Sequence, residues 1–182
     1  MRRVTLVLGL LLALTACSVT VTVDLPDQTL DLPGLADTVG KVVYPKDGLS
    51  FDPPPVDVVR GIRVEGVLEA ETSQPLNITL EFYARTRDPS QDPACTAPTP
   101  TFPQGIGVEP AIYLCSIGPD DQKVGQATFQ NSQQASFTLQ GTKLTEGIKA
   151  GRLWLGIKAS GLPSTPLTLT FLNMKAYVTV GL

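Results

Sequence analysis

Alternation between apolar and polar residues is the strongest pattern in this chain, and it predicts β-strands. Even positions are mostly apolar from Ile62 to Ala70 and again from Leu76 to Ala84, while odd positions are mostly polar or charged. Residues 71–75 between them have turn-forming composition. We therefore expect an antiparallel hairpin with one buried face. The residues predicted to face solvent are Arg63, Glu65, Glu69, Glu81, Tyr83, Arg85 and Arg87.

The same pattern predicts further strands and a bend in the last of them. The final segment changes phase near Leu172, which a β-bulge there would reconcile, and Gly61 and Gly66 mark further candidate bulges. A single helical turn is expected at residues 145–151, with Leu144 and Ile148 facing inward and Gly151 ending it. The remaining predicted strands are 18–23, 41–44, 111–117, 125–130, 135–139, 153–159 and 167–180.

These elements predict an all-β fold with at most one short helix. About seven to nine short strands with proline-rich connections are typical of an antiparallel β-sandwich, jelly-roll or immunoglobulin-like, with a partly closed barrel as the alternative. Residues 26–55 and 88–110 are rich in proline and lack periodicity. We expect residues 17–55 to form an N-terminal segment and residues 56–182 to form the sandwich domain.

The first 17 residues have the layout of an export signal. Arg2 and Arg3 precede an apolar run that is too short to cross a bilayer. The sequence Leu14-Thr15-Ala16-Cys17 then resembles the lipobox of bacterial lipoproteins. The alternative is an ordinary secretory signal with an incidental cysteine.

The lipobox resemblance implies a location and a covalent modification. The signal peptide, residues 1–16, would be removed, Cys17 would carry diacylglycerol on its sulfur, and a further acyl chain such as palmitate would follow on its amine. The protein would then be held extracytoplasmically in the cell envelope by its lipid. Ser18, in place of Asp, is compatible with sorting to the outer membrane if the host is diderm.

Charge and cysteine content narrow the possibilities further. Without residues 1–16 the chain has 12 basic and 17 acidic side chains, which gives no electrostatic basis for binding nucleic acid. Cys95 and Cys115 remain as a pair, and outside the cytoplasm we expect them to form a disulfide. A pair of thiols serving a metal or redox site is the alternative, although the spacing is not that of a CxxC motif.

No histidine occurs in the sequence, which removes histidine-based nucleophile systems and imidazole metal sites. A carboxylate pair drawn from Glu65, Glu69 and Glu81 could serve a glycosidase, but a solvated ladder of opposite charges explains these residues better. Calcium could bind at Asp47 with Asp52, or at Asp120 with Asp121, yet such pairs are more often turn formers. We therefore expect no catalytic residue, metal or cofactor.

Two aromatic side chains are the remaining candidates for contact with a ligand or partner. The phase of its strand places Trp154 opposite Leu153 and Leu155, beside Arg152 and Lys158, and Tyr83 lies on the predicted solvent face. The alternative for Trp154 is a face covered by other parts of the chain. We predict a non-enzymatic structural or protein-interaction module of the envelope, with carbohydrate binding as the alternative and a glycosidase-like enzyme using Glu65 or Glu81 as the third possibility.

Overall fold

A computed structural model describes residues 18–25, 27–32, 38, 40–50, 59–98, 111–159 and 167–181. These residues form one continuous, mostly antiparallel sheet of twelve strands, in the order β1-β12-β5-β10-β9-β6-β11-β3-β8-β7, with β2 also paired to β12 and β4 to β11. The strands are β1 (Ser18–Asp24), β2 (Gln28–Leu32), β3 (Val42–Pro45), β4 (Leu49–Ser50), β5 (Val59–Glu71), β6 (Thr79–Arg85), β7 (Cys95–Thr96), β8 (Ile112–Cys115), β9 (Gln122–Thr128), β10 (Gln134–Gln140), β11 (Arg152–Ala159) and β12 (Leu167–Gly181).

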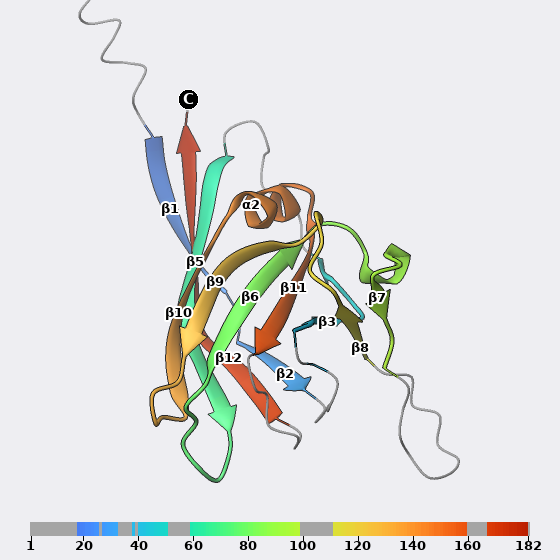
Figure 1. The fold of residues 1–182 in the computed structure, drawn as a ribbon. Coiled ribbons are helices and arrows are strands. Elements are labelled where there is room, and N and C mark those ends of the chain that lie inside the picture. The colour runs from blue at the N-terminus through green and yellow to red at the C-terminus, as the bar shows by residue number, and fades with distance from the viewer. Residues whose placement is uncertain are drawn as a thin grey trace, which may run out of the picture.

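The sheet curls so that one face encloses the main hydrophobic core (Figure 1). Phe82 of β6, Phe137 of β10 and Phe171 of β12 meet there, with ring centroids 5.6 to 6.0 Å apart. Since β12 and β6 are separated by three strands along the sheet, this contact requires strong curvature. The end strands β1 and β7 do not pair with each other in the described chain. The predicted all-β, sandwich-like class is confirmed, with more strands than expected.

The predicted hairpin between the two most regular segments is wrong. β5 pairs with β12 and β10, whereas β6 pairs with β9 and β11, so the β9–β10 hairpin lies between β5 and β6. The buried face of each segment is as predicted, with Leu68 and Leu80 completely buried. Alternation determines which face of a strand is buried, but it carries no information about which strand lies beside it.

The bulges in the long strands β12 and β5 agree with the sequence pattern. The β12–β5 register shifts between Leu172 and Lys175, and Asn173 there has a φ of 52°. A second shift falls opposite Gly61. Gly66 faces the first bulge, and a Cβ on it would lie 2.7 Å from the Phe137 ring, so a side chain has no room there.

One helix, α2 (Thr142–Lys149), packs on the sheet within the described residues. It begins three residues before the predicted turn, and it places Leu144 in the core with Ile148 packed against it. Gly151 follows its C-terminus with a φ of 72°, the left-handed conformation in which glycine commonly ends a helix. In the described part of the chain, no helix is long and apolar enough to cross a membrane.

A second, smaller core lies on the outer face of the sheet and consists of Val42, Tyr44, Tyr83, Cys115 and Trp154. Strands β3 and β11 are therefore buried on both faces. The 3-10 turn η3 (Pro89–Gln91) contacts β7 and β8 beside it.

β1 to β4 pair with strands that follow residue 56, so the expected division at residue 55 does not separate strands of this sheet.

Candidate functional site

Three strand ends meet at one end of the sheet, and one of these strands begins at Ser18, the residue that follows Cys17 in the sequence. The start of β1, the end of β12 and the start of β5 lie side by side, because Ser18 pairs with Gly181, and Val180 pairs with Val59. Figure 1 shows these ends extending past α2. Cys17 itself lies outside the described residues, but Ser18 is covalently joined to it. We call this region the anchor-proximal end.

β1 is the outermost strand of the anchor-proximal end, and all seven of its residues are exposed. Val19, Val21 and Val23 share one face and are exposed by 57%, 49% and 46%. Across the strand pair they face the apolar residues Val180, Val178 and Ala176 of β12. The other face of β1 carries hydroxyl groups, so the strand presents one apolar and one polar surface.

The outer backbone edge of β1 has no neighbouring strand among the described residues. Natural sheets protect such edges with prolines, lysines, bulges or covering loops, because unpaired N–H and C=O groups can accept another strand. β1 contains none of the protective residue types, and its only charged residue, Asp24, is its last. Its edge is therefore chemically ready to pair.

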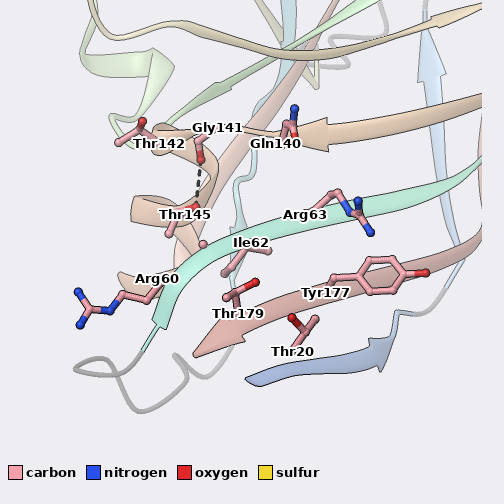
Figure 2. Close-up of a pocket in the computed structure, with 11 residues that line it drawn as sticks. Thr20, Arg60, Ile62, Arg63, Gln140, Gly141, Thr142, Thr145, Tyr177 and Thr179 are labelled. Carbon is pink, nitrogen blue, oxygen red and sulfur yellow. Dashed lines mark hydrogen bonds between the residues drawn. The ribbon is translucent and has the colours of Figure 1, made fainter. Parts of the chain in front are cut away.

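A shallow pocket of about 770 Å³ opens on the polar face at the same end (Figure 2). One row of its lining crosses the sheet from Thr20 through Thr179 to Gly61, and the next includes Tyr177, Arg63 and Gln140. A Cβ on Gly61 would meet no atom within 4 Å, so the missing side chain leaves the floor open. The first turn of α2 forms one wall through Gly141, Thr142 and Thr145.

Two arginines border this pocket. The Arg63 guanidinium lies 4.8 Å from the centre of the Tyr177 ring, and its Nε is 3.3 Å from the Glu65 carboxylate, with half of the side chain exposed. Arg60 stands at the rim, its stem against Gly181, and has no acidic partner within the described residues. The pocket therefore offers positive charge and hydroxyl groups to a ligand.

The buried guanidinium of Arg85 organises the opposite part of the sheet. Its side chain is completely buried, it donates through Nη2 to Asp92, and its Nε is 3.7 Å from the buried carboxylate of Asp121. Nη1 lies 3.0 Å from the sulfur of Cys95 and 3.3 Å from that of Cys115. The prediction that Arg85 faces solvent is wrong, because η3 and β7 cover the outer face of β6 here.

Ionisation in this Arg85 cluster follows from its hydrogen bonds and burial. The hydrogen bond from Arg85 holds the pKa of the Asp92 carboxyl below its usual range. Burial raises the pKa of the Tyr44 phenol, and its 2.7 Å hydrogen bond to Asp121 acts in the same direction. Every charged group here is engaged with another, so the cluster holds the segment that contains η3 and β7 against the sheet.

The two predicted aromatic contacts are not exposed. Trp154 is 1% exposed and Tyr83 is 7% exposed, and both belong to the smaller core. Gly48 lies directly against the Trp154 ring, and the Arg152 guanidinium covers it at 4.4 Å. For Trp154 the structure supports the alternative of a covered face, because β11 is an interior strand with cover on both sides, whereas the expectation that Tyr83 on β6 faces solvent is wrong because it packs in the smaller core. Neither ring is available as a platform for a sugar.

The candidate carboxylate pair is dispersed over the polar face. Glu65 on β5 and Glu81 on β6 lie in one row across the sheet, with Thr138 and Gln126 between them. Three strand spacings of about 4.8 Å separate them, beyond the range of a glycosidase pair. Glu69 lies four residues from Glu65 along β5. The structure therefore contradicts the use of these glutamates as a catalytic pair.

In the two aspartate pairs considered as calcium sites, the side chains bind other groups, are exposed or lie outside the described residues. Asp121 accepts hydrogen bonds from Tyr44 and from the Gly118 amide, and Asp120 pairs with Arg87 at 3.3 Å. Asp52 lies outside the described residues, and Asp47 is exposed. Across the described ranges, no three metal-ligating side chains converge.

The expected disulfide joins Cys95 of β7 to Cys115 of β8, which face each other in register. It closes a loop that includes residues outside the described chain and fixes β7 to the sheet edge. The bond lies against Arg85, so covalent and ionic links hold the same segment.

Comparisons with known proteins identify the N-terminus. Residues 1–18 match the model of the prokaryotic membrane lipoprotein lipid attachment site, which includes Cys17. The chain is therefore a membrane-anchored bacterial lipoprotein. No family model identifies the remaining domain, and no curated protein matched the sequence.

Solved structures of an iron and alpha-ketoglutarate-dependent endoperoxidase, NvfI, show limited similarity. A point variant of that enzyme aligns over 89% of this chain and 63% of its own, with 10% identity and a TM-score of 0.30. A second structure, in a different conformation, gives 11% identity over 89% and 61% of the two chains, with a TM-score of 0.31. This chain thus spans about 63% of that enzyme's length, and no activity is transferred from it.

Proposed function

We propose that this lipoprotein is a non-enzymatic interaction module of the cell envelope that binds an extended segment of another envelope protein along β1. In this proposal Cys17 is the acylated N-terminus, left after removal of residues 1–16, and the domain is extracytoplasmic. The Cys95–Cys115 disulfide supports that location, since such bonds persist mainly outside the cytoplasm.

The observation that carries the proposal is the unprotected edge of β1. A partner strand added there would gain main-chain hydrogen bonds, and alternate side chains would contact the stripe formed by Val19, Val21 and Val23. Burying three half-exposed valines adds apolar contact that a polar edge would not provide.

A partner other than a second copy is favoured by the position of the anchor. Two copies of β1 paired about a two-fold axis would run antiparallel, which places their Cys17 residues at opposite ends of the pair. Over seven residues that separation is about 23 Å along the strand. Both anchors could not then enter one membrane with the anchor-proximal end directed toward it.

Photocrosslinking in cells tests this proposal. A photoreactive amino acid at Thr22 of the full-length lipoprotein should yield one dominant adduct with another envelope protein, and Val21→Lys should reduce its yield about tenfold. Ile117→Lys is the matched control, because Ile117 is similarly exposed at 45% but lies away from β1. An adduct only with a second copy, or yields equal in both variants, would overturn the proposal.

A further inference from the structure

We infer that the pocket at the anchor-proximal end binds the phosphate headgroup of an anionic phospholipid in the membrane that holds the anchor. This inference rests on acylation at Cys17, which belongs to the proposed function. It does not depend on the protein partner of β1.

The position of the pocket is the first argument. Thr20 lines it and is three residues from Cys17, so at about 3.3 Å per residue it lies at most about 10 Å from the acylated residue. The polar headgroup layer on each side of a bilayer is about 5 to 8 Å deep. An acylated Cys17 must stay at the boundary of that layer, and β1 begins at the next residue. The pocket is therefore held at, or just outside, the outer boundary of the headgroup layer.

The chemistry of the lining is the second argument. Arg60 has no acidic partner in the described chain and Arg63 is half exposed, and the two guanidinium groups stand at opposite sides of the pocket (Figure 2), where each can donate to phosphate oxygens. The hydroxyls of Thr20, Tyr177 and Thr179 have no protein partner among the described residues, and they match the polar part of a headgroup. The mature chain is acidic overall, so its net charge would not attract it to an anionic membrane. Attraction would have to come from the local positive charge at the pocket.

Arg152 provides a matched control for Arg63. It too has one ion pair, to Asp88 at 3.3 Å, and one aromatic contact, with Trp154 at 4.4 Å. Its side chain is 59% exposed, compared with 49% for Arg63. Replacing either arginine by Gln removes a similar set of contacts, but only Arg63 borders the pocket.

The test uses the native lipoprotein reconstituted in vesicles of phosphatidylcholine and phosphatidylglycerol, with a trace of phosphatidylglycerol that carries a photoreactive headgroup. Intact mass first verifies the acyl groups, so a failed anchor is distinguished from a failed pocket. Illumination should crosslink lipid to peptides that contain Thr20, Arg63 or Tyr177.

The double variant Arg60→Gln/Arg63→Gln should lower that yield by up to about thirtyfold, since each of the two surface cations contributes about 1 kcal/mol to attraction by anionic lipid and about 1.4 kcal/mol corresponds to a factor of ten. Arg60→Lys/Arg63→Lys should retain most of it, and Arg152→Gln should leave it unchanged. Thermal melting checks that each variant is folded. Equal yields in the Gln double variant and the wild type, or crosslinks spread evenly over the surface, would overturn the inference.

Two further experiments test whether the ligand is lipid or free phosphate, and whether the pocket must lie close to the anchor. Inorganic phosphate, added at about 10 mM as a competing free anion, should not reduce the yield of lipid crosslinking. The anchored headgroups are present at a high effective concentration next to the pocket. Loss of crosslinking in phosphate would assign the pocket to the free ion and contradict the lipid assignment. Inserting about 12 Gly and Ser residues between Cys17 and Ser18 should lower the yield, since such a linker spans about 19 Å on average.

Discussion

Arg85 connects several segments of the outer half of the fold. Its guanidinium is completely buried, with three aspartates, Asp92, Asp120 and Asp121, within ion-pair distance and the two disulfide sulfurs also in contact. A buried charge is tolerated only when its partners replace the lost water. Asp92 supplies the strongest of these contacts from the segment that η3 begins, so its charge state controls how firmly that segment is held.

Stability should therefore depend on pH through Asp92. Its folded pKa is below the unfolded value of about 3.9, so its contribution is complete above about pH 5 and is lost as the pH falls through the folded pKa. We expect thermal melts of the wild type to show a fall in Tm below about pH 4 that is shallower in Asp92→Asn, which is already less stable at pH 7. Asp47→Asn, at an exposed position, is the control, and an identical pH profile in both variants would contradict this assignment.

At the level of single residues, sequence reasoning found those whose environment follows from local pattern. Gly151 at the end of α2 and the bulge near Leu172 are examples, because each follows from its immediate neighbours. Arg85 was misplaced, and the environment of Trp154 was left open, because distant segments cover them; the pocket beside Arg60 and Arg63 was not recognised because its other lining residues come from strands far apart in sequence. The short apolar run of Val42, Val43 and Tyr44 was the available signal that strands in this region are buried on both faces.

Among the described strands, β7 and β4 are the two least secured by backbone pairing. β7 has two residues and pairs only with β8, at the free edge of the sheet. The disulfide and the Arg85–Asp92 contact therefore stabilise β7 in its position, whereas long hydrogen-bonded ladders stabilise β5 and β12. Sequence reasoning predicted this covalent link correctly from compartment and cysteine count. It could not predict the position of β9 and β10 between β5 and β6, because strand order is set by contacts across the whole core.

Removing the disulfide should release this edge. We expect Cys95→Ala/Cys115→Ala to lower the free energy of unfolding by about 3 kcal/mol, from the chain entropy of a loop of this length. Chemical denaturation followed by the Trp154 fluorescence measures the change, since that ring packs in the core that contains Cys115. Reduced wild type should behave like the double variant, and a double variant as stable as the oxidised protein would refute the prediction.

In the whole molecule, the features that bear on binding gather at one end. The open edge of β1 and the pocket with Arg60 and Arg63 both lie at the anchor-proximal end, while the disulfide and the Arg85 cluster secure the opposite edge of the sheet. This arrangement separates a covalently stiffened body from a surface that, under the proposed function, is directed toward the membrane. The class of fold and the anchor followed from sequence, but the gathering of β1, β5 and β12 followed only from the structure.

In our proposal, acylation at Cys17 is the basis of that orientation. Cys17→Ser should abolish incorporation of an alkyne-tagged palmitate supplied to a bacterial expression host, and intact mass should show no diacylglyceryl group. Cys95→Ala/Cys115→Ala should keep full labelling, because those cysteines lie outside the lipid attachment site. Labelling that persists in Cys17→Ser would show that Cys17 is not the attachment point.

The direct succession of Cys17 and β1 also limits what the protein can encounter. Because β1 forms seven consecutive residue pairs with β12 from Ser18 onward, no flexible linker separates Cys17 from the folded domain. If Cys17 is acylated as proposed, the search for a partner is two-dimensional, at a height limited by the short covalent link to the lipid. Under the proposed function, a partner anchored in the same leaflet would be held at the height of the β1 edge, whereas one in the aqueous space would first have to approach the bilayer.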